Sequence, residues 1–214
     1  MQLVLDKLVP EPLRDKLNVS ESGIWKKQVT LNKGDNVFVQ APSGTGKTTL
    51  LHIMYGLRKD YTGTLQWGQT VFSSMDDNAV AELRSGKVSI IFQDMRLFPE
   101  LTAWENLVIK ATLKGSLDEA RLMEWMERLG IAAKKNALAA TMSYGEQQRL
   151  AILRALLQPF DWLLMDEPFS HLDIANTRKA IDLIQEVAGQ HGAGLLLADL
   201  DENNYFPYTQ TFLL

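Results

Sequence analysis

Short apolar runs alternate with helical periodicities along this chain, and the alternation predicts an α/β fold. The runs lack the polar alternation of a half-exposed strand, which suits strands buried on both faces of a parallel sheet. They occupy residues 37–39, 87–92, 162–165 and 194–198. Helical patterns at 47–57 and at about 174–190 follow the first and the third run. We therefore expect a mainly parallel sheet covered by helices on both faces.

Two parts of the chain depart from this alternation. Residues 1–40 are predicted to form short strands joined by turns, and another short strand is predicted at 64–67. Residues 103–157 carry apolar side chains at helical spacing and few β-rich runs. The first part is expected to form an antiparallel β region, and the second part a helical lobe inserted between strands.

The chain as a whole is expected to form a single domain, residues 1–214, because its length allows one generous domain. Its core is assigned to residues 1–95 and 158–214, and its helical lobe to residues 96–157. A last apolar stretch at 211–214 is predicted to be an edge strand.

A glycine-rich segment joins the first buried strand to the helical pattern after it. The segment reads Ala41-Pro42-Ser43-Gly44-Thr45-Gly46-Lys47-Thr48-Thr49. Glycines let successive backbone N–H groups turn toward an anion, and the start of the helix adds partial positive charge. This order of strand, loop and helix predicts a phosphate loop, in which Lys47 reaches the terminal phosphates and the Thr48 hydroxyl binds Mg²⁺.

A glycine-rich turn that merely caps a helix is the simpler alternative. Ala41 stands where the pattern usually has its first glycine, and alanine fits there only if the backbone avoids a positive φ. Gly44, Gly46, Lys47 and Thr48 nevertheless occur in the order that phosphate binding needs. The segment is therefore interpreted as a nucleotide-binding loop.

Two carboxylates end the third apolar run, where Asp166 and Glu167 follow four apolar residues. Ligands bind at the carboxyl ends of parallel strands, and alternation along the strand turns the two acids in different directions. Asp166 is expected to hold Mg²⁺, directly or through water, and Glu167 to orient and polarise the attacking water. A solvated strand end with two acids is the alternative, and the phosphate loop favours the catalytic interpretation.

A serine-capped helix is predicted just before that strand. Ser143 and Glu146 have the spacing of a capping box for the helix that runs through Leu150 and Leu157. The cap does not explain Gly145 in the first turn, where glycine costs about 1 kcal/mol relative to alanine. We expect a group to approach the backbone there, and a second phosphate at this helix N-terminus would be such a group.

Composition excludes several other classes of protein. A formal net charge of −4 does not fit a general nucleic-acid binder. The absence of cysteine excludes a disulfide framework and a cysteine-ligated zinc site, and it is compatible with a reducing cytoplasm. No apolar stretch approaches the ~18 residues of a spanning helix, and no signal peptide is expected at the N-terminus. A function at a membrane would therefore require another chain as anchor.

These motifs, in this order, make the chain similar to the nucleotide-binding subunits of ATP-binding cassette (ABC) transporters over nearly its whole length. Residues 41–49 resemble the family's phosphate loop and residues 162–167 its acidic strand end. Gln93 resembles the Q-loop glutamine, residues 142–149 the signature usually written LSGGQ, and residues 170–173 the D-loop. The resemblance implies a P-loop NTPase fold of the RecA type, and ATP with Mg²⁺ as ligands.

Two subfamilies are suggested by different stretches. The Glu-Gln-Gln-Arg sequence after Gly145 resembles ATPases of the lipoprotein-release, macrolide-export and cell-division type. The stretch Glu167-Pro168-Phe169-Ser170 resembles small-solute importers instead.

The resemblance also implies a mechanism. Two copies would meet head to tail, so that Ser143 and Gly145 of one copy act on the γ-phosphate bound by the other. Gln93 would contact Mg²⁺ or water and couple to an integral membrane permease, which would dock near Gln93 and residues 96–99. Closing on ATP and reopening after hydrolysis would drive the permease. The chain is then expected in the cytoplasm, at the inner face of the cell membrane.

Three positions depart from the family pattern. The family usually carries a switch histidine where this chain reads Leu197-Ala198-Asp199, and Ala198 has no donor for a γ-phosphate. Tyr144 replaces the first glycine of the signature, which is tolerable if its ring points away from the nucleotide. No aromatic residue stands near Asn18, where the family often stacks adenine, and the nearest one, Trp25, is interpreted as a strand-core residue.

Nucleotide binding with slow or conditional hydrolysis is the expected consequence. Loss of one preorganised contact to a developing charge lowers a rate by roughly 10²–10³. His171 of the D-loop could compensate, but it is interpreted as a plain interface or solvated histidine.

Other functions are weighed against an ATPase that energises a permease. A regulatory or mechanical module that signals through a membrane protein without moving a solute is the main alternative, and the altered switch position favours it. A third alternative is a soluble ABC-type ATPase that acts on nucleic acid or ribosomes. The negative net charge, the single cassette and the absence of a coiled-coil insertion argue against it. A small-molecule P-loop kinase has no need of the serine-glycine signature.

Overall fold

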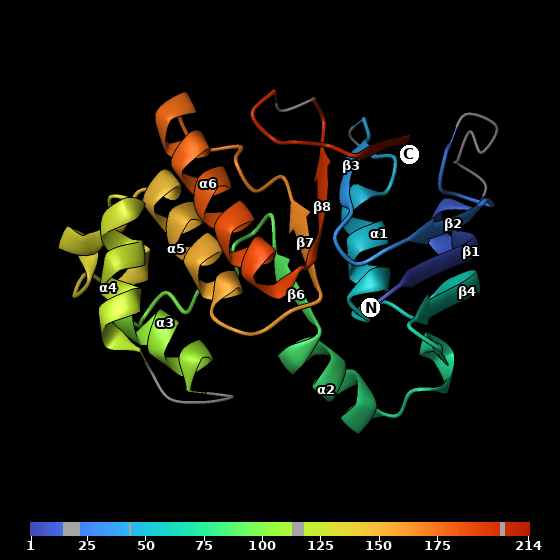
Figure 1. The fold of residues 1–214 in the computed structure, drawn as a ribbon, viewed down its shortest axis with the longest axis horizontal. Coiled ribbons are helices and arrows are strands. Elements are labelled where there is room, and N and C mark those ends of the chain that lie inside the picture. The colour runs from blue at the N-terminus through green and yellow to red at the C-terminus, as the bar shows by residue number, and fades with distance from the viewer. Residues whose placement is uncertain (15–21, 43, 113–117, 202–203) are drawn as a thin grey trace.

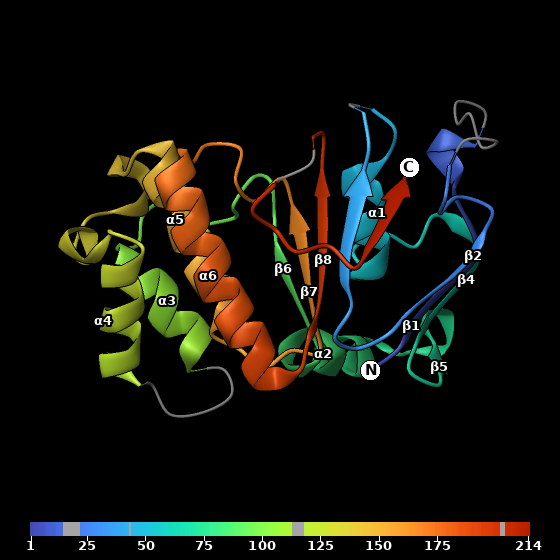
Figure 2. The same cartoon turned by 45° about the horizontal axis from the view of Figure 1, so that its top comes forward.

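A five-stranded parallel sheet forms the centre of the molecule (Figure 1). The computed structural model describes residues 1–14, 22–42, 44–112, 118–201 and 204–214. The strands lie in the order β6 (Val88–Ile91), β7 (Trp162–Asp166), β8 (Gly194–Asp199), β3 (Asn36–Gln40) and β9 (Gln210–Leu213). All neighbouring pairs are parallel. The phosphate loop after β3 and the carboxylates at the end of β7 therefore lie at the same edge of the sheet, the upper edge in Figure 2.

An antiparallel sheet covers one side of the molecule, as predicted for the N-terminal part. Its order is β2 (Gln28–Leu31), β1 (Leu3–Pro10), β4 (Tyr61–Trp67) and β5 (Thr70–Val71). Helix α1 (Lys47–Met54) lies between this sheet and the parallel sheet (Figure 2). Four of its apolar side chains are fully buried there: Leu50, Leu51, Ile53 and Met54.

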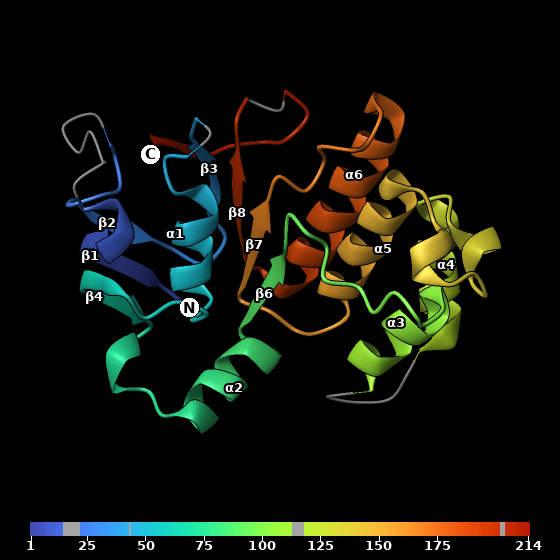
Figure 3. The ribbon, with the colours of Figure 1, turned by 180° about the vertical axis from the view of Figure 1, so that it is seen from behind.

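The other face of the parallel sheet is covered by helices. Helix α6 (Ile174–His191) packs next to the sheet, and α3 (Ala103–Ala111), α4 (Glu119–Arg128) and α5 (Tyr144–Leu156) form the helical region that was predicted (Figure 3). Short 3₁₀ helices at Glu11–Leu13, Phe72–Ser74, Ala132–Lys134 and Ala139–Thr141 complete the secondary structure. Among the described residues, no helix is both long and apolar enough to cross a membrane.

Two helices differ from the prediction. The helix expected at 47–57 ends at Met54, and Gly56 then takes a φ of +79°, where an added Cβ would lie 2.3 Å from the Phe72 ring. Helix α2 (Asp77–Gly86) was not predicted. Its side chains are mostly polar, and only Val80 and Leu83 are buried, so few apolar positions mark this helix in the sequence. The final edge strand is confirmed as β9, which pairs with β3.

Candidate nucleotide-binding site

The phosphate loop has the backbone that its glycines make possible. Gly44 and Gly46 have φ angles of +83° and +107°, which other residues rarely adopt. Ala41 does not have a positive φ, so its backbone is one that alanine adopts without strain. Ser43 lies outside the described residues. A pocket of about 250 Å³ lies beside this loop and is lined by Leu13, Gly44, Gly46, Lys47, Thr48, Thr49, Gln93 and Glu167.

Lys47 projects from the first turn of α1 into this pocket and is almost fully buried, with 7% of its surface exposed. Its Nζ donates a hydrogen bond to the carbonyl oxygen of Ala41 at 2.8 Å. The same ammonium lies 3.2 Å from Oε1 of Glu167. The loop thus holds a buried positive charge next to the carboxylate that the sequence assigned to catalysis.

Glu167 leaves the end of β7 with a φ of +46°, a left-handed conformation uncommon for a residue other than glycine. Its backbone N–H donates to the carbonyl of Ala198 at 3.0 Å, which fixes the turn against β8. Its side chain accepts a hydrogen bond of 3.0 Å from Nε2 of Gln93. Lys47, Gln93 and Glu167 come from three different parts of the fold and line one pocket. Unusual backbone conformations of this kind concentrate at functional sites.

Asp166 is the buried member of the acidic pair, with 1% of its surface exposed. Burial raises the pKa of its carboxyl to about 6; the nearby Thr48 hydroxyl opposes this rise and the Glu167 charge adds to it. Among the described residues, neither carboxylate oxygen has a hydrogen-bond partner of normal geometry. A buried carboxylate without donors is suited to bind a cation. Oxygen ligands such as this carboxylate and the Thr48 hydroxyl are those that Mg²⁺ prefers, so the residues present fit the ion.

The serine-capped helix is confirmed as α5. Ser143 Oγ accepts from the backbone N–H of Glu146 at 3.3 Å, and the Glu146 carboxylate accepts from the N–H of Ser143 at 2.9 Å. A Cβ on Gly145 would lie 2.9 Å from the carbonyl oxygen of His171. Within one chain, the group that approaches this glycine is therefore the backbone of the D-loop. Neither Ser143 nor Gly145 lines the phosphate-loop pocket.

The tyrosine of the signature points outward. Tyr144 is 65% exposed, and its ring centroid lies 5.1 Å from that of His171. Both side chains thus lie on the surface at the start of α5.

Gln148, one turn further along α5, is a positioning residue that sequence reasoning missed. Its Nε2 donates to the carbonyl oxygen of Glu167 at 3.1 Å, and its Oε1 accepts from the N–H of His171 at 2.9 Å. Only 2% of Gln148 is exposed. Its place in the signature sequence was the available signal, but its contacts depend on how α5 packs against the end of β7.

Ala198 and Asp199 lie at the carboxyl end of β8 (Gly194–Asp199). Ala198 is fully buried and pairs with Asp166 in the sheet. Asp199, which follows it, was also missed as a site residue. Burial raises the pKa of the Asp199 carboxyl; the charge of Glu167 adds to this rise and that of Lys47 opposes it. Asp199 lies at the end of β8, between β7 and β3, and lines a neighbouring cavity with Phe169 and Thr177 and not the phosphate-loop pocket.

Trp25 supports the loop from beneath. Its side chain is fully buried, but it lies in a turn before β2 and not in a strand as predicted. Its Nε1–H points to the carbonyl oxygen of Thr45 at 3.4 Å. Asn18, near which the sequence lacks an aromatic residue for adenine, lies outside the described residues.

A family model described as ABC transporter matches residues 26–170. The chain belongs to the ABC transporter family. It is similar to the lipoprotein-releasing system ATP-binding protein LolD of Legionella pneumophila (strain Lens), at 32% identity over 177 residues, 81% of this chain and 78% of LolD. It is similar to the uncharacterized ABC transporter ATP-binding protein YbbA of Escherichia coli (strain K12), at 34% identity over the same shares of the two chains.

Solved structures of ABC cassettes have the same fold. The dimeric structure of MJ0796, a bacterial ABC transporter cassette, matches with a TM-score of 0.75 at 27% identity, over 94% of this chain and 88% of that one. A post-hydrolysis state of MJ0796 bound to ADP and phosphate matches with a TM-score of 0.77 at 26% identity over the same shares. The chain is thus an ATP-binding cassette that energises an ABC transporter.

Proposed function

We propose that two copies of this ABC cassette close head to tail on ATP, hydrolyse it and thereby drive a membrane permease. The observation that carries the proposal is the meeting of Lys47, Gln93 and Glu167 at the phosphate-loop pocket. A phosphate-binding cation, a polar side chain and a carboxylate at one pocket are what positioned attack of water on a phosphoryl group requires.

The ion pair between Lys47 and Glu167 supports a specific order of events. In this arrangement the carboxylate of Glu167 is occupied by Lys47 and Gln93. A bound γ-phosphate would compete for Lys47, because phosphate oxygens are strong acceptors for an ammonium group. Glu167 would then be free to orient water and accept its proton. Asp166, Thr48 and Gln93 would hold Mg²⁺, which would neutralise charge on the phosphates.

The second copy is needed because Ser143 and Gly145 lie outside the pocket of their own chain. The N-terminus of α5 carries the partial positive charge of a helix start, which favours a phosphate. The similarity to a cassette solved as a dimer supports pairing of two copies. The names of the LolD relatives support a place in a transporter system, and hence at the cytoplasmic face of a membrane through a permease.

Hydrolysis is proposed to be slow, or to depend on the permease. The buried methyl group of Ala198 offers no donor at the end of β8, and Asp199 adds a negative charge there. Loss of one preorganised donor lowers such a rate by roughly 10²–10³. The same observation favours a second candidate function, an ATP-driven regulatory or mechanical module that acts on a membrane protein without transporting a solute.

ATP turnover of the isolated chain and of the chain assembled with its membrane partner tests the proposal. We expect weak turnover alone and a clear rise in the assembled complex. Equal and rapid turnover in both states would contradict the conditional mechanism. Solute flux in reconstituted vesicles, compared with the state of the membrane protein itself, separates transport from signalling.

A further inference from the structure

A cavity that contains two carboxylates lies between the D-loop, the start of α6 and the end of β8; we call it the acidic cavity. It has a volume of about 300 Å³, and Asp199, Asp201 and Thr177 line it. Among the described residues, no lysine, arginine or histidine does so. Arg178 lies near it, with its guanidinium 4.4 Å from the centroid of the Tyr205 ring, but it is not part of the wall. The cavity thus presents negative charge without a cation of its own.

The charge of Asp199 is poorly compensated. Burial raises the pKa of its carboxyl, and the charges of Glu167 and Asp201 add to this rise. A hydrogen bond of 2.7 Å from the N–H of Leu200 opposes the rise, as does the charge of Lys47. Lys47, however, already contacts Glu167 at 3.2 Å. A partly buried carboxylate in such surroundings is unfavourable unless a cation joins it.

Thr177 gives an independent indication of a ligand. Only 7% of this residue is exposed, and its hydroxyl group forms no hydrogen bond with a described residue. A threonine in a helix can return its hydroxyl to a backbone carbonyl of the preceding turn, as Thr112 at the end of α3 does to Val108 at 2.9 Å. In Thr177 only the backbone N–H bonds back, to the carbonyl of Asp173 at 2.8 Å. A buried hydroxyl that lines a cavity and has no such partner is suited to bind a ligand there.

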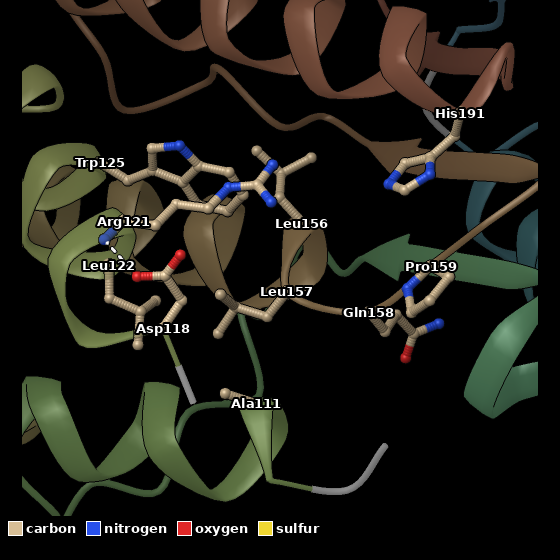
Figure 4. Close-up of a pocket in the computed structure, with 10 residues that line it drawn as sticks. All are labelled: Ala111, Asp118, Arg121, Leu122, Trp125, Leu156, Leu157, Gln158, Pro159 and His191. Atoms are coloured by element: carbon tan, nitrogen blue, oxygen red, sulfur yellow. Dashed lines mark hydrogen bonds between the residues drawn. The ribbon is translucent and has the colours of Figure 1, made fainter. Parts of the chain in front are cut away.

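A second cavity shows how charge is balanced elsewhere in this fold. It has a volume of about 200 Å³ and lies between α4 and the ends of α3, α5 and α6 (Figure 4). Asp118 and Arg121 both line it, and Arg121 also donates to Oε1 of Gln190 at 2.9 Å. The phosphate-loop pocket likewise holds a pair of opposite charges, Lys47 and Glu167. The acidic cavity differs from both, because only carboxylates carry charge on its described wall.

We propose that the acidic cavity binds a divalent cation, with the carboxylates of Asp199 and Asp201 and the hydroxyl of Thr177 as ligands. Such oxygen donors favour Ca²⁺ and Mg²⁺, and a wall without described histidine or cysteine disfavours zinc. Ca²⁺ fits better than Mg²⁺, because it accepts irregular sets of oxygens that water completes. Among the described residues, no three acidic or histidine side chains form a metal cage. We therefore expect weak binding, with a Kd on the order of 0.1–1 mM.

This cation site is separate from the Mg²⁺ position proposed at Thr48, Gln93 and Asp166, since none of these three residues lines the acidic cavity. A cation on Asp199 would place positive charge one residue beyond Ala198, whose side chain has no donor. The inference goes beyond the proposed function, which does not depend on this second cation.

Equilibrium dialysis of the full, nucleotide-free chain against radioactive Ca²⁺ tests this inference. D166N serves as the background, because it removes the carboxylate assigned to Mg²⁺ at the nucleotide site. We expect D166N to bind one Ca²⁺ per chain with a Kd on the order of 0.1–1 mM. Unlabelled Ca²⁺ should displace the bound ion at lower concentration than Mg²⁺ does.

Two further substitutions on the D166N background test the ligands. T177V keeps the shape of the side chain and removes its hydroxyl, and D201N changes an exposed residue, so it remains informative if T177V fails to fold. Each should weaken Ca²⁺ binding by roughly 10-fold or more, the usual effect of disturbing a metal site. Fully exposed Asp77 on α2 provides the matched control, and D77N should leave binding unchanged.

The inference is wrong if D166N binds no Ca²⁺, or if D201N and folded T177V bind it as tightly as the background does. Neither result would touch the proposed function, which is measured separately as turnover of Mg-ATP by the wild-type chain and its complex.

Discussion

Gln93 donates a hydrogen bond of 3.0 Å to the side chain of Glu167, although 74 residues separate them in the chain. The bond ties the loop after β6, which leads to the helical region, to the carboxylate at the end of β7. A displacement of the helical region can therefore reach the group that orients water.

Replacing Gln93 by alanine removes this link. We expect ATP turnover of the assembled complex to fall by roughly 10–100-fold, since a hydrogen bond to a charged group contributes about 1.5–3 kcal/mol. Nucleotide affinity should change less, because Lys47 and the loop backbone remain. Steady-state kinetics beside equilibrium binding of a fluorescent ATP analogue separates the two effects. A large loss of affinity with unchanged turnover would show that Gln93 acts mainly in binding.

Replacing Lys47 by alanine should weaken ATP binding by roughly 10–100-fold or more, because a charge-assisted contact to the phosphates is lost. Isothermal titration with Mg-ATP measures the change. Lys59, which is 69% exposed, offers a matched control, and K59A should bind ATP as the wild type does. Unchanged affinity in K47A would contradict the assignment of the phosphate loop.

Replacing Asp166 by asparagine should stabilise the protein in the absence of nucleotide and Mg²⁺. Burial raises the pKa of Asp166 from 3.8 to about 6, so the folded state disfavours the charged form. The resulting loss in the free energy of unfolding is absent below pH 3.8, grows as the pH rises toward 6 and is constant above pH 6. At pH 7.5 its removal corresponds to up to about 3 kcal/mol, since one pKa unit is about 1.4 kcal/mol.

Chemical denaturation of D166N and the wild type at two pH values checks this prediction. The free energy of unfolding of D166N should exceed that of the wild type by a large margin at pH 7.5 and by a small one at pH 4. Asp161 serves as the control, because its pKa is shifted in the opposite direction. Although burial opposes it, the hydrogen bond from Lys33 and nearby positive charges hold the pKa of Asp161 below its ordinary value. D161N should therefore destabilise the protein at neutral pH. A destabilised D166N would contradict the account of an uncompensated carboxylate.

Replacing Gly145 by alanine should destabilise the fold by about 1–3 kcal/mol, the usual penalty for overpacking. The new Cβ would meet the carbonyl oxygen of His171 at 2.9 Å, and backbone cannot yield as a side chain does. Gly189 in α6 has open space around it, so G189A should stabilise by about 0.5–1 kcal/mol through helix propensity. Thermal unfolding of the two variants gives the comparison. Equal stabilisation by both would show that the D-loop does not constrain Gly145.

Local patterns were enough to predict the parallel sheet, the strand, glycine-rich loop and helix around Lys47, and the capped helix α5. Each of these depends on residues close in sequence, or on the rule that parallel strands end at one edge. Helix α2 was missed because it buries only Val80 and Leu83. The roles of Gln148 and Asp199 depend on how α5 and β8 pack beside β7, which no local pattern contains.

Gly145 illustrates the same limit. The sequence indicated that a group approaches this residue, and the structure identifies the group as the carbonyl of His171, 26 residues further along the chain. Similarly, the sequence marked Trp25 as a buried aromatic, but its contact with Thr45 beneath the phosphate loop depends on the turn before β2.

Glu167 is the residue whose removal should stop hydrolysis while leaving the closed state intact. E167Q keeps a side chain of the same size that cannot accept a proton, so turnover should fall by roughly 10²–10⁴. Exposed Glu82 on α2 offers the control, E82Q, which should hydrolyse ATP as the wild type does. Unchanged turnover in E167Q would exclude Glu167 as the base.

Light scattering of E167Q, with and without saturating Mg-ATP, tests most directly whether two copies enclose the nucleotide. The account predicts the mass of one chain without nucleotide and of two chains with Mg-ATP, and the pairing should be lost when Ser143 is also replaced by a bulky residue such as arginine. A variant that binds Mg-ATP and keeps the mass of a single chain at every concentration would contradict the account.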